Sequence, residues 1–290
     1  MQYSRIMLII VPMTDNTSRK KKKKSPVFII IIIACLAVMA FAAYNLIKLQ
    51  LEYRQGRDEY DELQKYTQVT AEQETAQEAP AEEDAVQDTF SKLDGPIVPH
   101  MKCPVDVDFA PLKEINEDVI GWIYVGGVDI SYPVVQGEDN DYYLHRTFMN
   151  TENFAGSIFM ESGNAPDFSD PNTILYGHNM KDQSMFAKLR LLSDEEKYKN
   201  DPYIWILTPE HTYRYRIFSL HRVSYDGDVY TLFSGPSELV TDYIEKCAAD
   251  SLVPFETGDA GQDSRIITLS TCSSNDSERY VVQGILDQID

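Results

Sequence analysis

Cysteine is scarce in this sequence, with four residues in a chain of 290. Cys35 lies in a long apolar run, which leaves Cys103, Cys247 and Cys272 for the rest of the chain. Three such cysteines are too few for the disulfide framework of a small secreted protein. Pairing of Cys103 with Cys247 would leave Cys272 as a single thiol.

Basic residues are also under-represented, because 26 Lys and Arg stand against 46 Asp and Glu, for a formal net charge of −20. Seven of the basic residues and one acidic residue, Asp15, fall within residues 1–24. This segment therefore carries about +6, and residues 25–290 carry about −26. Binding to nucleic acid requires clustered cations, so the acidic body excludes nucleic acid as a partner.

The usual signatures of metal and cofactor sites are missing from the sequence. No His/Cys pair has zinc-ligand spacing, no acidic loop has the EF-hand pattern, and no glycine-rich phosphate loop is present. We therefore expect neither a cofactor nor a metal ion, and any chemistry must come from the side chains of the protein.

One long apolar run, Val27 to Ile47, contains no charged residue. As a helix rising ~1.5 Å per residue it would be roughly 30 Å long, the thickness of the hydrocarbon core of a bilayer. Lys20 to Lys24 directly precede the run and nothing comparable follows it. The positive-inside rule then predicts a basic cytoplasmic tail at residues 1–24, a transmembrane signal anchor at 25–47 and an extracellular remainder at the cell membrane.

A cleaved signal peptide is the alternative interpretation of this run. Ala40-Phe-Ala42 offers a cleavage site with small residues, but the apolar region of a signal peptide is usually only about 7–15 residues long. An uncleaved anchor is therefore favoured, and a mature N-terminus near Ala43 would contradict it. Met7 and Met13 are alternative start sites.

A polar segment, residues 48–97, follows the anchor and is expected to be an extracellular linker. Residues 48–67 read as a polar helical extension, and residues 68–95 are rich in Glu, Gln, Ala and Asp with few apolar side chains, a composition typical of an acidic disordered linker. The linker would hold the globular part, residues 98–290, away from the membrane.

The globular part contains many short β-type runs and few helical ones. Gly126-Gly127 separates two of these runs as in a hairpin. Strands are predicted at 119–125, 128–135, 156–160, 172–176, 203–207, 212–223, 265–271 and 279–286, and helices at 109–116, 185–192 and 237–247. This pattern favours a mostly β fold, a closed or nearly closed barrel with peripheral helices.

Cys272 ends the run Arg265 to Thr271 and is followed by the polar stretch Ser-Ser-Asn-Asp-Ser-Glu. A cysteine in the middle of a strand usually packs as a small apolar residue. Cys272 instead stands where its strand leaves the core. A thiol with a pKa of ~8.5 is only a few per cent thiolate at neutral pH, so a nucleophilic role requires positive charge nearby.

Arg279 and His178 are the residues that would supply this charge and the proton transfer. Arg279 begins the next β run, and adjacent strands are ~4.8 Å apart, so its guanidinium would lie within reach of a substrate on Cys272. His178 follows the apolar run Thr173 to Tyr176 and one glycine, and strand-end loops commonly carry functional residues. The alternatives are a surface salt bridge for Arg279 and a turn-capping role for His178.

These residues together resemble the sortases, and class B sortases most closely. The Cys and His motifs, Thr268-Leu-Ser-Thr-Cys272 with Arg279 and Asn172-Thr-Ile-Leu-Tyr-Gly-His178, carry most of the resemblance. It covers roughly residues 105–290 and extends to these segments: Gly156-Ser-Ile-Phe-Met, Phe168-Ser-Asp-Pro-Asn, Ser184-Met-Phe, Ile120-Gly-Trp-Ile and Tyr132-Pro-Val-Val-Gln.

The resemblance implies a cell-surface cysteine transpeptidase of Gram-positive type on an eight-stranded β-barrel. Cys272 would attack the Thr–Gly or Thr–Asn bond of a sorting motif and form a thioacyl enzyme. His178 would protonate the leaving amine and deprotonate the incoming one, Arg279 would hold the substrate carbonyl or the oxyanion, and Ser270 and Thr271 would position the substrate. The partners implied are surface proteins with a sorting motif, similar to NPQTN or [S/P]PxTG, and an acceptor amine of peptidoglycan or a pilin.

The residues by themselves indicate only a thiol enzyme for acyl transfer. Two alternatives stay open on the sequence: an extracellular cysteine peptidase that only hydrolyses, and a surface scaffold domain in which Cys272 is structural. Addition of an amine distinguishes the first alternative from a transpeptidase, and native alkylation of Cys272 tests the second.

Overall fold

The computed structural model describes residues 26–69, 101–254, 257–272 and 278–290. The chain divides into two compact units, Met1–Leu49 and Gln50–Asp290. The predicted basic tail lies outside the described residues. Helix α1 (Pro26–Leu63) begins in the first unit, where its apolar side chains are exposed. Its mean hydropathy of 2.5 over the most apolar window and its length are sufficient for a membrane span.

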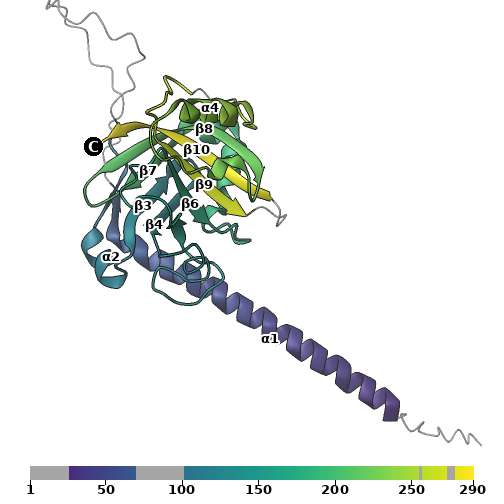
Figure 1. Cartoon of the computed structure of the whole chain (residues 1–290). Coiled ribbons are helices and arrows are strands. Elements are labelled where there is room, and N and C mark those ends of the chain that lie inside the picture. The colour runs from purple at the N-terminus through teal and green to yellow at the C-terminus, as the bar shows by residue number, and fades with distance from the viewer. Residues whose placement is uncertain (1–25, 70–100, 255–256, 273–277) are drawn as a thin grey trace, which may run out of the picture. The chain divides into compact units, whose positions relative to one another are not determined.

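The second unit is built on a closed barrel of eight strands (Figure 1). Around the barrel the order is β10-β8-β7-β3-β4-β5-β6-β9, and the neighbours are antiparallel except for the parallel pairs β4–β5 and β6–β9. The strands are β3 (Val119–Val125), β4 (Ile130–Val135), β5 (Ile158–Met160), β6 (Asn172–Gly177), β7 (Tyr203–Leu207), β8 (Thr212–Ser224), β9 (Ile266–Cys272) and β10 (Glu278–Ile289).

The eight strands predicted from the sequence are thus confirmed, with ends that differ by a few residues. Their β-branched and aromatic side chains suit a pleated surface with one face in the core. Trp122 and Trp205, from the paired strands β3 and β7, are both fully buried in this core.

The helices expected near 109–116 and 237–247 are α2 (Phe109–Ile115) and α4 (Glu238–Ala249), and the segment expected near 185–192 is the 3-10 helix η3 (Phe186–Ser193). The sequence analysis missed α3 (Glu195–Asn200), η4 (Asp228–Tyr230) and the small two-stranded sheet of β1 (Thr67–Val69) and β2 (Val105–Val107). The glycine pair forms η2 (Gly126–Val128), which joins antiparallel β3 and β4 as the hairpin signal predicts.

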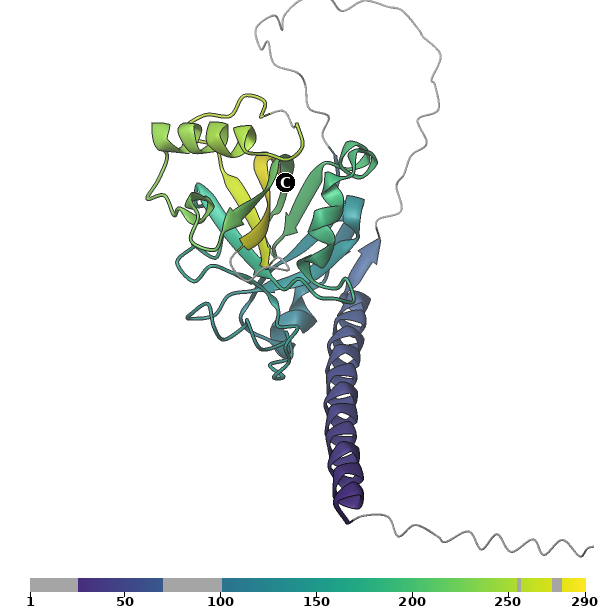
Figure 2. The same ribbon diagram turned by 90° about the vertical axis from the view of Figure 1, so that its right-hand side faces the viewer.

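Helix α4 covers the outer face of the sheet formed by β8, β10 and β9, as Figure 2 shows beside the yellow strands. Val240 and Ile244 of α4 are buried against Phe218 of β8 and Val281 of β10 in a second apolar cluster. This cluster is separate from the core inside the barrel, so the sheet has apolar side chains on both faces in this region.

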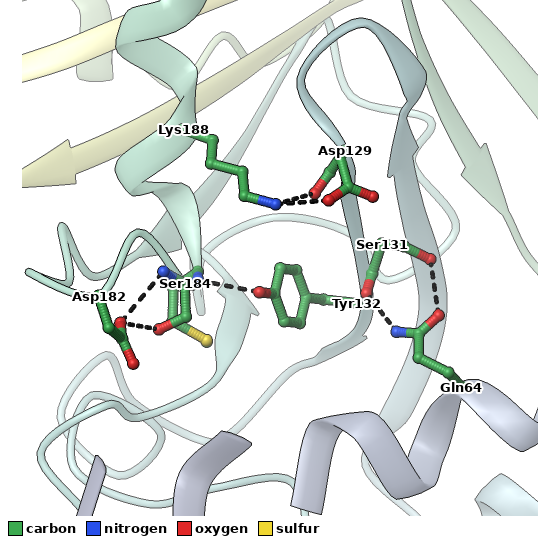
Figure 3. A network of polar contacts seen from close by, with 8 residues as sticks. Gln64, Asp129, Ser131, Tyr132, Asp182, Ser184 and Lys188 are labelled. Carbon is green, nitrogen blue, oxygen red and sulfur yellow. Dashed lines mark hydrogen bonds and ion pairs between the residues drawn. The ribbon is translucent and has the colours of Figure 1, made fainter. Parts of the chain in front are cut away.

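The C-terminal end of α1 packs against the barrel. Tyr60 donates to the Gly156 carbonyl at 2.7 Å, and Gln64 donates to the Ser131 carbonyl at 2.8 Å. Figure 3 shows Tyr132 next to Ser131 in β4. The Tyr132 hydroxyl accepts from the Met185 backbone amide at 3.1 Å. Residues 50–69, which the sequence predicts as part of a linker, are therefore ordered structure in contact with the barrel, because their aromatic side chains have partners over 60 residues away.

Cys103 and Cys247, whose pairing the sequence left open, are not joined in a disulfide. Both cysteines are buried as thiols, Cys103 in the core inside the barrel and Cys247 in the cluster under α4. Burial raises the pKa of Cys103 to about 12 and the pKa of Cys247 to about 11, so neither thiol ionises at neutral pH.

Candidate active site

Three strand ends of the barrel bring the predicted site residues together. Cys272 is the last residue of β9, and its register partner across the antiparallel pair is Arg279 at the start of β10. On its other side, β9 runs parallel to β6 and pairs Thr271 with Gly177, the residue before His178. The topology therefore places Cys272 between Arg279 and His178, as the sequence predicted from strand-end positions.

Strand alternation puts positions 268, 270 and 272 on one face of β9. The side chain of Cys272 and residues 273–277 lie outside what the structure describes. The geometry of the site is therefore built from the residues around the end of this strand.

His178 is half-buried and donates a hydrogen bond from Nε2 to the Leu144 carbonyl at 2.8 Å. A carbonyl only accepts, so this contact fixes the proton on Nε2 and leaves Nδ1 as the acceptor of the neutral ring. Burial, and then the nearby His145, lower the pKa of His178, while the Leu144 hydrogen bond opposes the shift. The imidazole is therefore mainly neutral at neutral pH.

The loop after His178 is closed at its base. The Phe186 amide donates to the His178 carbonyl at 3.1 Å, and Asn179 forms an isolated antiparallel bridge with Met185. Gly177 is required for this packing, since a Cβ there would lie 2.8 Å from the Phe186 ring and 2.5 Å from Cδ1 of Ile158. These contacts hold the imidazole at the end of β6.

Arg279 is half-buried, and its Nη1 donates to the neighbouring Glu278 carbonyl at 3.0 Å. A guanidinium carries a positive charge and has five donors in a planar fork. It therefore brings a fixed positive charge to the strand end that carries Cys272. The predicted alternative is an ion pair with Asp276 or Glu278; Asp276 lies outside the described residues, and Glu278 accepts from Arg279 through its backbone carbonyl.

A cleft of about 630 Å³ lies at these strand ends, and His178, Ser270, Thr271 and Arg279 all line it. Leu144, Phe159 and Tyr176 give it apolar and aromatic walls. A cleft of this size with a few converging polar groups is suited to a short peptide segment or a small molecule.

Ser270 and Thr271 contribute to the cleft in different ways. The Ser270 hydroxyl is 2.8 Å from the hydroxyl of Tyr230, which belongs to the turn on the opposite wall. The Thr271 hydroxyl is buried and has no hydrogen-bond partner within the described part of the chain. An unsatisfied buried hydroxyl at the edge of a cleft is available to a bound substrate.

The sequence analysis missed a polar group behind the cleft wall, in which Glu161 contacts the lining residues Asn140 and Tyr176. Its carboxylate accepts from Asn140 Nδ2 at 2.7 and 2.8 Å and from the Tyr176 hydroxyl at 2.8 Å. Burial by itself raises the pKa of Glu161, but these hydrogen bonds outweigh it and leave the pKa lowered, so the carboxylate is ionised. Asn140 and Glu161 had no recognisable signal, because they meet only through the fold.

Of the histidines in the described part of the chain, only His178 lines the cleft. His145 and His211 are exposed, His221 is buried under α4, and His100 lies outside the described residues. Over the ranges that the structure describes, no group of three or more His, Cys, Asp and Glu side chains is arranged to hold a metal ion.

Comparison with known proteins places these features in a family. The model of the sortase domain family matches residues 123–287. The chain is 38% identical over 179 residues to sortase B of Listeria monocytogenes, a match that covers 60% of this chain and 72% of that protein.

Two solved structures extend the likeness to the fold. The crystal structure of sortase B from B. anthracis in complex with AAEK1 has a TM-score of 0.62 at 27% identity, over 82% of this chain and 99% of that one. A sortase B–substrate complex from Staphylococcus aureus has a TM-score of 0.57 at 29% identity, over 62% of this chain and 84% of that one.

Proposed function

The chain belongs to the sortase family as a class B cysteine transpeptidase, and from this premise we propose that it cleaves a C-terminal sorting motif between Thr and Gly or Asn and transfers the surface protein to a cell-wall or pilin amine. The observation that carries the proposal is the register of β9, which pairs Cys272 with Arg279 on one side and approaches His178 on the other. This arrangement supplies a nucleophile, a fixed cation and a proton carrier at one cleft.

Cys272 is the nucleophile of the proposed reaction. Its thiol gives its proton to His178, whose neutral ring has Nδ1 available, and the sulfur attacks the carbonyl carbon of the motif threonine. The C–N bond then breaks, the leaving amine takes the proton from the imidazolium, and a thioester remains. An incoming amine attacks the thioester, loses its proton to His178 and releases the sulfur of Cys272.

Arg279 stabilises the oxygen that becomes negative during both attacks. Its charge is fixed, so it needs no proton transfer to do so, and its half-buried position reduces competition from water. Ser270 and Thr271 position the substrate beside the nucleophile, which agrees with their place in the cleft lining.

The apolar part of α1 anchors the enzyme in the cell membrane, with residues 1–24 in the cytoplasm and the barrel outside. The hydropathy of α1 and the lysines before it support this topology. An extracellular barrel would meet both proposed partners, a surface protein with a sorting motif and an amine of the wall or a pilin.

Product analysis tests the proposed function. The full-length chain in detergent micelles is incubated with quenched peptides that carry NPQTN-like or [S/P]PxTG-like motifs, with and without a panel of amines, and the products are identified by mass spectrometry. We expect a peptide that ends in Thr joined to one class of amine, and no such product from Cys272→Ala.

The controls separate the remaining alternatives. Hydrolysis to the free acid with every amine would contradict transfer to the acceptors tested and favour a peptidase. Product formation by Cys272→Ala at the wild-type rate would remove Cys272 from the mechanism.

A further inference from the structure

Four buried polar side chains form a row across the sheet beneath α4: Asn172 of β6, Thr268 of β9, Gln283 of β10 and Ser219 of β8. Each is fully buried. Gln283 is the register partner of both Thr268 and Ser219, and Asn172 is diagonal to Thr268. The surrounding face is apolar, and burying polar side chains there costs free energy unless they are hydrogen-bonded.

Hydrogen bonds join Asn172, Thr268 and Gln283 to one another, and Ser219 is bonded to the helix. Thr268 donates to Asn172 Oδ1 at 2.7 Å, and Gln283 donates to the Thr268 hydroxyl at 3.1 Å and to the Tyr243 hydroxyl of α4 at 2.6 Å. At the far end, Ser219 donates to the Cys247 carbonyl, also in α4, at 2.7 Å. The row therefore ties the helix to the sheet in one register.

Asn172 also binds the turn η4. Its Nδ2 donates to the Val229 carbonyl at 3.1 Å and to the Thr231 carbonyl at 3.0 Å. These carbonyls flank Tyr230 in the turn η4. Because Thr268 occupies Oδ1, the amide is fixed with both hydrogens toward the turn, and Val229 also accepts from Tyr243 at 2.8 Å.

The turn that Asn172 holds is a wall of the catalytic cleft. Tyr230 and Thr231 line the cleft, and the Tyr230 hydroxyl meets Ser270 two positions before Cys272. The Tyr230 ring also stacks on Tyr176, with 6.3 Å between ring centroids and 27° between planes. A displaced turn would move both contacts and change the width of the cleft.

We propose that Asn172, fixed by Thr268, is a positioning residue that sets the wall formed by residues 228–231 and thereby the affinity of the cleft for the sorting peptide. The inference rests on the proposed function, because it assigns that peptide to this cleft. Thr268 and Asn172 begin the two motifs that carry Cys272 and His178. In this proposal they act together to hold the turn η4. Hydrogen bonds among these buried side chains favour one arrangement of the elements they join.

The test compares Asn172→Ala with Ser219→Ala in the full-length chain in detergent micelles. Asn172→Ala removes the hydrogen bonds to Thr268, Val229 and Thr231, and Ser219→Ala removes the one to Cys247, so both variants should lower the melting temperature, Asn172→Ala by more. Only Asn172 contacts the turn. We expect Asn172→Ala to raise KM for a quenched sorting-motif peptide about tenfold with kcat within about twofold, and Ser219→Ala to leave KM unchanged.

Hydrogen exchange gives a readout that does not depend on activity. In the peptide covering the turn, Asn172→Ala should speed exchange at least about tenfold, and Ser219→Ala should not. Should Asn172→Ala fail to fold, the nearly isosteric Thr268→Val, which frees the amide to rotate, is expected to show both effects in smaller measure.

Two results would overturn the inference: a folded Asn172→Ala enzyme with wild-type KM and wild-type exchange in the turn, or an equal rise in KM for Ser219→Ala. Failure of the wild-type enzyme to process any peptide would instead overturn the proposed function, and the exchange comparison would still decide whether Asn172 holds the turn.

Discussion

At the residue scale, the site depends on the state of three groups. His178 is held by the Leu144 carbonyl and has a lowered pKa because of its burial, so the imidazole of the resting enzyme is mainly neutral. The charge at the strand end then comes from Arg279 alone among the three proposed catalytic residues. This makes the arginine the group whose chemistry is hardest to replace.

Replacement of Arg279 by lysine is therefore expected to lower kcat by about 100-fold, the usual effect of removing an oxyanion donor. Lysine keeps the charge but loses the planar fork and reach of the guanidinium. The measurement is steady-state cleavage of a quenched sorting-motif peptide. Arg222→Lys is the matched control, because Arg222 is exposed on the adjacent strand β8. Near-normal turnover by Arg279→Lys would remove it from the oxyanion role.

At the element scale, the end of α1 behaves as part of the barrel unit. Tyr60 contacts Gly156, Glu59 accepts from the Met149 amide at 2.8 Å, and Leu63 is fully buried in the main core. The contacted residues Met149 and Gly156 lie in the same connection between β4 and β5 as Leu144, whose carbonyl orients His178. A truncated enzyme that starts after residue 69 would therefore lose support for the active site as well as the anchor.

Leu63→Ala is expected to destabilise the barrel unit by about 2–5 kcal/mol, the cost of deleting a buried leucine side chain. Leu51→Ala removes the same atoms from the same helix, but Leu51 is 58% exposed, so a change within about 0.5 kcal/mol is expected. Denaturant unfolding of the full chain, followed by tryptophan fluorescence, compares the two. Equal losses would show that this end of α1 does not pack as described.

Strands and helices were predictable from the sequence where the local pattern of apolar residues determines them. The eight strands and α4 follow from β-branched runs and helical spacing, and the positions of Cys272, His178 and Arg279 follow from strand ends. The helical character of residues 48–67 was predicted, but their packing against the barrel was not, because the partners of Tyr60 and Leu63 lie far along the chain. For the same reason Asn140, Glu161 and Tyr230 gave no signal, because only the closed barrel brings Asn140 and Tyr230 to one cleft and Glu161 into contact with Asn140.

At the scale of the whole molecule, stability depends on pH through the buried histidine His221. His221 is buried under α4, with Nδ1 2.8 Å from the Ser219 hydroxyl. Burial lowers its pKa, and the nearby Asp250 only partly opposes the shift. The unfolded chain therefore binds a proton here at a higher pH than the folded chain does, so stability falls as pH drops below the ordinary histidine value of about 6.5.

Through His221, the free energy of unfolding is expected to fall by no more than about 1.4 kcal/mol for each pH unit below that value. We expect the drop in melting temperature between about pH 7.5 and about pH 5.5 to be smaller in His221→Asn than in the wild-type chain. His211→Asn, at an exposed site, should keep the wild-type drop. An unchanged drop in His221→Asn would show that this imidazole is charged in the folded state.

The most direct test of the central claim is to trap the acyl enzyme. The full-length chain is mixed with a sorting-motif peptide in the absence of amine, quenched with acid, digested and examined by mass spectrometry. We predict an adduct on Cys272 whose mass is the peptide up to its threonine, and its disappearance, with formation of the peptide–amine product, when an amine is added before the quench. An adduct on another residue, or cleavage of the peptide by an enzyme whose Cys272 has been alkylated, would contradict the account.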